Sequence, residues 1–311
     1  MLKHRLMVAL PLAAVTLVAF LTPGKIGGIA FLLLVSAAML LAVYEFFGIT
    51  KKLGYPGMPD LVMAVGLARL LISAIVLNLP PHHKMTEQQY AQLFSQRDFM
   101  LTDCICLGIL LLMIMYRICK TELTKENVLG AFISLGAYLY ICWPLALATR
   151  LFYMGGPDGM WSRSLVLFLL VVVRLGDTGG YAIGCSTAKF LPGGNHKISP
   201  VLSPKKSWEG LFGSMLFSSL AAAGLWFWLA PQLSAANVLS EFTLPVVVGF
   251  AIVSAVIGFM GDLAESALKR VADVKDSGRV PGLGGLLDLM DSVLVNIPVF
   301  FFLLILLGLF C

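Results

Sequence analysis

Residues 261–291 read GDLAESALKRVADVKDSGRVPGLGGLLDLMD. Apolar runs long enough to cross a bilayer lie on both sides, so this stretch is expected to connect two membrane-spanning helices. A dense mixture of carboxylates, cations and glycines is costly to place at a membrane unless it does chemistry there. Carboxylates bind Mg²⁺, whereas cations and glycine amides bind phosphate. The charged residues of the stretch are Asp262, Glu265, Lys269, Arg270, Asp273, Lys275, Asp276, Arg279, Asp288 and Asp291.

The composition of the chain excludes a soluble globular domain. Of the 311 residues, 59% are hydrophobic and only 13% are charged, and the mean hydropathy is +0.91. Apolar runs recur along the whole length, each close to the roughly 20 residues that a membrane-spanning helix needs. The sequence therefore predicts an all-α polytopic membrane protein with about nine transmembrane helices. The predicted spans are 6–22, 26–49, 61–79, 103–118, 128–149, 162–183, 211–230, 244–261 and 292–311.

Lysine and arginine are distributed unequally between alternate connections. With the N-terminus inside, the inner segments hold fifteen of the 22 basic residues and the outer segments hold five. Because cytoplasmic loops carry the excess of Lys and Arg, this predicts a cytoplasmic N-terminus and a C-terminus outside. The two long charged connections, 184–210 and 262–291, then both face the cytoplasm, where nucleotides are found. We divide the chain into N-terminal transmembrane helices, 1–150, and a C-terminal transmembrane catalytic region, 151–311.

Two motifs precede the charged stretch. Residues 203–210 read SPKKSWEG, and a proline turn followed by two lysines at the start of a helix makes an anion site. The alternative is a positive-inside anchor with Trp208 at the membrane interface. Arg174 and Asp177 lie three residues apart on one helical face and can form an ion pair. They make either a structural pair in the bundle interior or a polar wall of an active site whose glycines let substrate approach the backbone.

The charged stretch itself combines ligands for a metal and for phosphates. Asp262 is one turn from Glu265 at the end of the eighth span, and Asp288 and Asp291 share one face at the start of the last helix. Carboxylates from two helices suit a hard divalent cation, and the glycines and cations suit a triphosphate. The chain contains no GxxxxGK[ST], GxSxG or HExxH motif, which excludes a P-loop enzyme and the common serine and zinc hydrolases. Phosphoryl chemistry needs metal, charge neutralisation and in-line positioning, all of which these loops could supply.

The pattern from Ser266 to Asp291, S-A-L-K-R-x4-K-D-S-G followed by P-G-x-G-G-x-x-D-x-x-D, resembles the signature of phosphatidate cytidylyltransferases, or CDP-diacylglycerol synthases. The segments 177–181 and 203–210 are similar to two other recurring stretches of that family, and Glu45-Phe46-Phe47 is similar to a weaker one. The chain departs from the family pattern in having Leu283 in place of a histidine and Leu289 in place of an arginine, where Asp288-Leu289-Met290-Asp291 stands for Asp-Arg-x-Asp. It is also one residue short between Gly278 and Pro281.

The resemblance implies an enzyme that uses CTP, phosphatidate and Mg²⁺ and that works among membrane lipids without nucleic acid. It implies a position in the bacterial inner membrane with the active site on the cytoplasmic side. A second cation and a homodimer are left open. The implied metal ligands are Asp262, Asp288 and Asp291. The implied catalytic set is Lys205, Lys206, Lys269, Arg270, Asp177 and Glu209. The implied substrate-binding set is Ser203, Ser266, Lys275, Asp276, Gly284 and Gly285.

Two rival functions fit parts of the sequence. The first keeps CTP but changes the acceptor to an isoprenoid lipid, either as a CTP-dependent transferase or as a lipid kinase. The second is a cation-coupled transporter, since the intramembrane charges Arg69, Arg174 and Asp177 could line a pathway. Against the transporter, the charges gather at one membrane face and no inverted repeat is apparent.

Overall fold

The computed structural model describes residues 14–78, 87–155, 159–191, 194–200, 202–235, 242–278 and 285–308. The chain divides into two compact units. The first unit comprises residues 1–163, 271–289 and 310–311, and the second comprises 164–270 and 290–309. The division predicted at residue 150 separates N-terminal transmembrane helices from a catalytic region. It does not describe compact units, and it stays a prediction.

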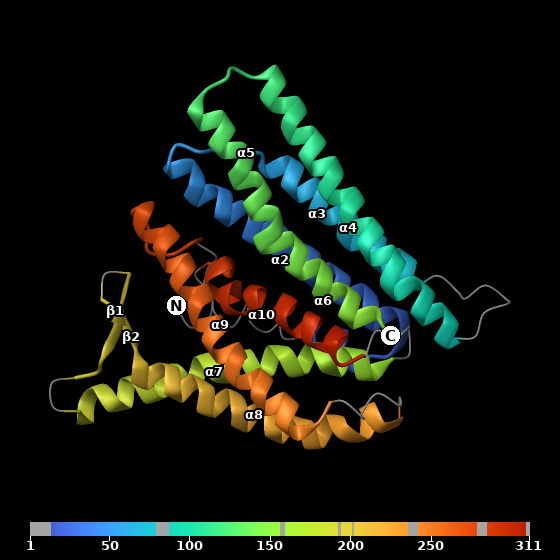
Figure 1. Ribbon diagram of the computed structural model, residues 1–311, viewed down its shortest axis with the longest axis vertical. Coiled ribbons are helices and arrows are strands. Elements are labelled where there is room, and N and C mark those ends of the chain that lie inside the picture. Colours follow the sequence, from blue (N-terminus) through green and yellow to red (C-terminus); the bar gives the residue numbers. More distant parts are fainter. Residues whose placement is uncertain are drawn as a thin grey trace. The chain divides into compact units, whose positions relative to one another are not determined.

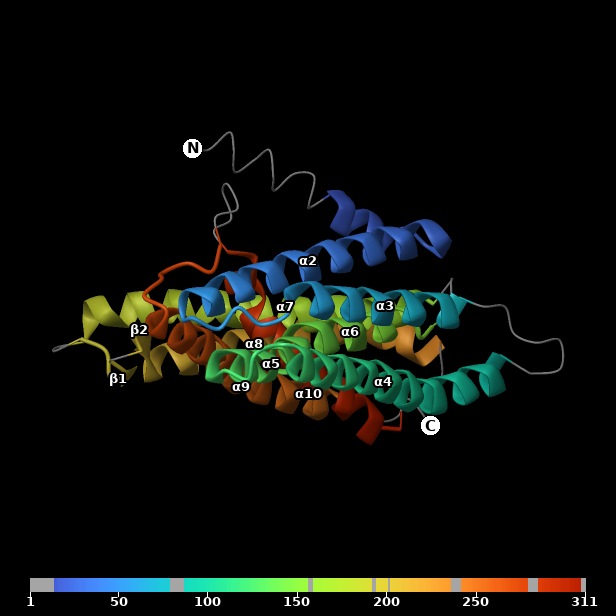
Figure 2. The same cartoon turned by 90° about the horizontal axis from the view of Figure 1, so that it is seen from above.

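The first unit is a bundle of long apolar helices. They lie side by side in Figures 1 and 2, with α3 against α2, α4 and α6. At the centre, Phe31 of α2 stacks on Phe152 of α6 with ring centroids 3.8 Å apart. The elements are α2 (Gly24–Lys52), α3 (Pro59–Asn78), α4 (Glu87–Lys120), α5 (Lys125–Ala137), the π-helix η1 (Tyr138–Cys142) and α6 (Trp143–Tyr153).

A buried ion pair crosses this bundle. The guanidinium of Arg69 in α3 donates to the carboxylate of Asp103 in α4 and to the hydroxyl of Ser73. The indole Nε1 of Trp143 donates to the second oxygen of Asp103 at 3.2 Å. The side chains of Arg69 and Asp103 are only 3% and 18% exposed. A charge taken out of water is tolerated only when a partner compensates it, so each member depends on the other.

The second unit holds most of the remaining elements. Its aromatic core surrounds Phe168, which stacks on Phe300 with ring centroids 5.8 Å apart. Helices α7 and α8 approach closely because Gly179 faces Phe217, and Gly213 of α8 faces Ile183 of α7. The glycines of the Asp177–Tyr181 segment therefore serve helix packing. The elements are α7 (Met160–Phe190), β1 (Lys197–Ser199), β2 (Ser203–Ser207), α8 (Trp208–Ala235), α9 (Leu244–Val271) and α10 (Leu286–Leu306); α7 and α10 each begin in the first unit.

An antiparallel hairpin, β1–β2, connects α7 to α8 (Figure 1). The prediction that Lys205 and Lys206 begin a helix is wrong, because both lie on β2 and the helix starts at Trp208. Pairing with β1 keeps this segment extended, with Lys197 opposite Ser207. Successive side chains of a strand point to opposite faces, so the two neighbouring lysines are separated. Lys205 is exposed, whereas Lys206 is half-buried.

The protein is an integral membrane protein. Seven helices among the described residues are long and apolar enough to cross a bilayer. They match seven of the nine predicted spans. The third predicted span corresponds to α3, and residues 6–13 of the first predicted span lie outside the described residues. Several helices continue past the predicted ends. In α9 the helix runs ten residues beyond residue 261, because the segment SALKRV consists largely of good helix formers.

Candidate functional site

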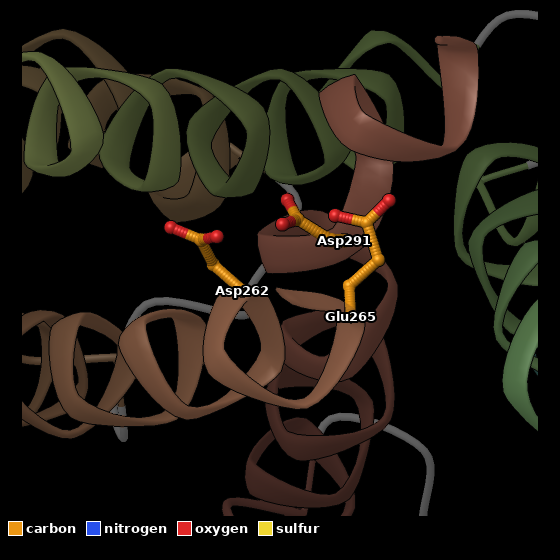
Figure 3. A group of neighbouring side chains, drawn as sticks. All are labelled: Asp262, Glu265 and Asp291. Atoms are coloured by element: carbon orange, nitrogen blue, oxygen red, sulfur yellow. The ribbon is translucent and has the colours of Figure 1, made fainter. Parts of the chain in front are cut away.

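Three carboxylates of the second unit face a common point. Asp262 and Glu265 come from α9 and Asp291 comes from α10 (Figure 3). One oxygen from each lies within 4.8 Å of the others. Glu265 and Asp291 are 3% and 4% exposed, whereas the side chain of Asp262 is 43% exposed. The group is thus closed on one side and open on the other. We call these three residues the carboxylate group.

Helix geometry explains why these three residues meet. Asp262 and Glu265 are three apart, which places them on one face of α9. Gly258 of α9 packs against Ser292 and Asn296 of α10, and Gly261 packs against Val295 and the backbone of Asp291. The missing side chains let the two helices approach closely at this level. Asp291, about one turn beyond the start of α10, therefore reaches the face of α9 that carries Asp262 and Glu265.

Lys206 supplies a positive charge beside the carboxylate group. Its ammonium donates to Asp262 Oδ2 at 2.8 Å and to the carbonyl oxygen of Phe259 at 3.1 Å. It also lies 4.5 Å from the centre of the Phe259 ring. Burial lowers the pKa of Lys206 from its ordinary value, while Asp262, Asp291 and Asp177 act in the opposite direction. These contacts tie strand β2 to helix α9.

Asp177 of α7 belongs to the same surroundings. It forms the expected ion pair with Arg174 at 3.3 Å, and both side chains are about two-fifths exposed, at 40% and 41%. It also interacts electrostatically with Asp262 and Lys206. Four segments that are distant in sequence, namely α7, β2, α9 and α10, therefore contribute charged side chains to one place.

The predicted residues that follow on α9 have different environments. Lys269 donates to Glu265 Oε2 at 2.9 Å, an i,i+4 pair that also supports the helix. The hydroxyl of Ser266 lies 3.5 Å from Asp262 Oδ1. Arg270 is exposed in the last turn, where a cation interacts favourably with the helix dipole. The structure thus brings Lys269 and Ser266 to the carboxylate group and leaves Arg270 at the surface.

Glu209, at the start of α8, contacts the hairpin side of the chain through His196. Its Oε1 accepts from the backbone N–H of His196 at 3.1 Å and lies 2.7 Å from Nδ1 of the same histidine. Ser203 stands at the start of β2 and pairs in register with Ser199. Lys205 is exposed on the opposite face of β2 from Lys206.

Asp288 lies in a separate polar junction within the first unit. Its Oδ2 accepts from the backbone N–H of Ser277 at 3.1 Å. The same junction contains Glu45 of α2, which is 6% exposed and accepts from the Ser277 hydroxyl and from the N–H groups of Leu286 and Leu287. Among the described residues, the group able to hold a metal ion contains Glu265 where the sequence interpretation had Asp288.

The remaining predicted substrate-binding residues lie between α9 and α10. Lys275 and Asp276 are exposed. Gly285 is buried, and a side chain there would collide with the Ser277 hydroxyl and approach the Asp288 carboxylate. Gly284, with Leu283 beside it, lies outside the described residues.

The carboxylate group has the chemistry of a divalent cation site. Three negative charges this close together repel one another unless a cation compensates them. Their oxygen donors suit Mg²⁺, which is typically held by one or two carboxylates together with waters and substrate phosphates. Asp262, the most exposed of the three, borders the open side on which a phosphate could complete the coordination. The residues present therefore fit a magnesium ion.

Comparison with known proteins gives the family. A model of the cytidylyltransferase family matches residues 3–307. The chain belongs to the cytidylyltransferase family. The phosphatidate cytidylyltransferase of Staphylococcus aureus (strain COL) is 27% identical over 298 residues, covering 94% of this chain and 96% of the relative. That of Staphylococcus epidermidis is 38% identical over 155 residues, covering 50% and 53%. The uncharacterised protein YnbB of Escherichia coli (strain K12) is 37% identical over 139 residues, covering 44% and 41%.

Two residues of this family member were not assigned a site role from the sequence. The sequence could have indicated Glu265 as a further metal ligand, since it lies one turn from Asp262 on the same helical face. The indication for Glu45 was weaker, an acidic residue at the end of an otherwise apolar span. Its partners lie more than 230 residues further along the chain, so only the fold could identify them.

Proposed function

We propose that this membrane protein transfers the cytidylyl group of CTP to phosphatidate, which gives CDP-diacylglycerol and pyrophosphate. The observation that carries the proposal is the carboxylate group with Lys206 beside it, at the charged end of a membrane-crossing helix. Membership of the cytidylyltransferase family supports the transfer. The phosphatidate cytidylyltransferase of S. aureus, which aligns with nearly the whole chain, supports phosphatidate as the acceptor.

The reaction joins two anions. A phosphate oxygen of phosphatidate attacks the α-phosphorus of CTP, and the bond from that phosphorus to the oxygen bridging to the β-phosphorus breaks, so pyrophosphate leaves. The attacking phosphate is already anionic at neutral pH, and no protein base is required. The main barrier is charge repulsion, which fixed positive groups lower. Mg²⁺ would supply positive charge and orient the phosphates.

The side chains have distinct parts in this proposal. Asp262, Glu265 and Asp291 hold the metal, and Lys206 and Lys269 orient Asp262 and Glu265 through their ion pairs. Lys205 and Arg270, both exposed, are placed to meet the phosphates of CTP as it arrives from water. Asp177 holds Arg174 beside the same charges.

Transfer of label identifies both the group moved and the acceptor. Purified protein is incubated with phosphatidate, Mg²⁺ and CTP labelled at either the α- or the γ-phosphorus. We expect label from the α-position, and none from the γ-position, in the lipid phase. Label from the γ-position would instead indicate a lipid kinase. Transfer to an isoprenoid phosphate but not to phosphatidate would replace the proposed acceptor.

Removing the Lys206 charge should impair turnover. Lys206→Met abolishes the bonds to Asp262 and Phe259, and loss of a residue that orients a metal ligand typically costs about 10–100-fold in affinity or activity. Lys197→Met is the matched control, because Lys197 is an exposed lysine of the same hairpin. Steady-state CTP turnover of the two variants is the measurement. Equal rates for both would contradict the assigned role of Lys206.

The proposed topology places the site on the cytoplasmic side of the bacterial inner membrane, with nine spans, the N-terminus inside and the C-terminus outside. In a cysteine-free background, Lys197→Cys and Asp273→Cys should resist a membrane-impermeant thiol reagent in intact cells. Gln89→Cys, in the connection predicted to lie outside, should react. All three should react after the cells are permeabilised. Labelling of the first two from outside would reverse the orientation.

A further inference from the structure

We infer that Glu45 is a positioning residue, which holds the first turn of α10 and so fixes the helix that carries Asp291. This inference rests on the proposed function only in taking the carboxylate group as the metal site. Glu45 lies in the second predicted span, far in sequence from every residue of that group. It is a buried acid of the first unit to which the proposed reaction gives no part.

The Glu45 carboxylate caps the start of α10. Oε1 accepts from the backbone N–H of Leu286 at 3.0 Å, and Oε2 accepts from that of Leu287 at 2.8 Å. The first N–H groups of a helix have no partner within the helix, so a carboxylate here satisfies them. Its negative charge also lies at the positive end of the helix dipole. Caps usually come from a neighbouring residue, whereas this one comes from another transmembrane helix.

Glu45 also fixes the chain segment that leads toward α10. The Ser277 hydroxyl donates to Glu45 Oε2 at 3.0 Å, and the N–H of Asp288 lies 3.3 Å from the same hydroxyl. The segment passes so close that any side chain at Gly278 would collide with the Glu45 carboxylate. One buried side chain thus fastens both Ser277 and the first turn of α10.

The consequence for the metal follows from the helix itself. Asp291 stands one turn beyond the capped residues on the same helix, α10. A ligand carboxylate must be held within a fraction of an ångström to bind a metal tightly. Glu45→Gln keeps the size of the side chain but turns one acceptor into a donor, which faces N–H groups. We therefore expect α10 to loosen at its start and metal affinity to fall.

Two measurements on the full-length protein in detergent test this. The first is the affinity for Mn²⁺, a paramagnetic substitute for Mg²⁺, obtained by counting free ions by electron paramagnetic resonance. The second is amide hydrogen exchange in peptides covering residues 277–290. For Glu45→Gln we expect roughly tenfold or greater loss of Mn²⁺ affinity, the range seen when groups that orient metal ligands are removed, together with faster exchange. Glu45→Asp, which keeps the charge, should restore part of both.

Glu126→Gln is the matched control, because Glu126 is an exposed acid in the first turn of α5. It should match the unaltered protein in both measurements. Unchanged Mn²⁺ affinity in Glu45→Gln would overturn the inference, as would weaker binding with unchanged exchange. If Glu45→Gln does not fold, Glu45→Asp with unaltered affinity and exchange would overturn it as well. Neither measurement involves lipid or CTP, so failure of the proposed transfer to phosphatidate would be seen separately.

Discussion

Asp291→Asn and Asp262→Asn should each lower CTP turnover at limiting Mg²⁺ by at least roughly two orders of magnitude. The loss of one preorganised electrostatic contact at a reacting centre typically lowers the rate by that factor. Asparagine keeps the size and much of the hydrogen bonding of aspartate but removes the charge that would hold the cation. Both residues belong to the carboxylate group. Initial rates of label transfer across a range of Mg²⁺ concentrations are the measurement, and excess Mg²⁺ should recover part of the loss.

Asp273→Asn is the control for these substitutions. Asp273 is exposed and has φ +52°, a left-handed conformation that asparagine adopts as readily as aspartate. Asp288→Asn completes the series. If Asp288 serves only to accept a hydrogen bond from the Ser277 N–H, Asp288→Asn should lower CTP turnover less than Asp262→Asn and Asp291→Asn do. The decrease should also be independent of the Mg²⁺ concentration. Near-normal rates of Asp262→Asn and Asp291→Asn at limiting Mg²⁺ would exclude the metal site described above.

Asp103→Leu should lower the free energy of unfolding by about 3–5 kcal/mol, the usual cost of leaving one member of a buried ion pair uncompensated. Arg69 is 3% exposed on its side chain, and it would retain its charge inside the bundle. The double variant Arg69→Met with Asp103→Leu should recover most of this stability, since replacing both members with apolar residues is often neutral. The midpoint of unfolding in a titration from mild detergent into sodium dodecyl sulfate measures each variant.

Asp60→Asn, an exposed acid in the first turn of α3, serves as the control for the stability series. Its midpoint should match that of the unaltered protein. If Asp103→Leu unfolds no more readily than Asp60→Asn, the ion pair contributes nothing to the stability of the bundle. If the double variant is as unstable as Asp103→Leu, the residues around the pair depend on its polar contacts with Ser73 and Trp143.

The membrane class and the pairing of nearby charged residues could be predicted from the sequence, because both depend on local patterns. Hydropathy located the spans, and the spacing of Asp262 from Glu265 and of Arg174 from Asp177 follows from helix geometry alone. Hydropathy could not give the helix ends, since α9 continues through charged residues that are good helix formers. Nor could it show that β2 separates Lys205 from Lys206.

The membership of the carboxylate group depends on packing between helices. Asp288 and Asp291 share one face of α10, and nothing local distinguishes their roles. The close approach of α9 to α10 at Gly258 and Gly261 brings Asp291 to Glu265. Asp288 instead binds the backbone of Ser277, in a junction that also requires Glu45 from the second predicted span. Contacts between residues this far apart in sequence cannot be predicted from local sequence patterns.

The length of α9 determines where its acidic face meets the membrane. Asp262 lies eighteen residues after Leu244, or about 27 Å along the axis at 1.5 Å per residue. The hydrocarbon core is about 30 Å thick. An untilted helix that enters the core at Leu244 therefore brings Asp262 to within about 3 Å of the opposite boundary of the core, close to the lipid headgroups. In the proposed reaction, a site at this boundary would let CTP dissolved in water and a lipid phosphate embedded in the leaflet meet without either one changing phase.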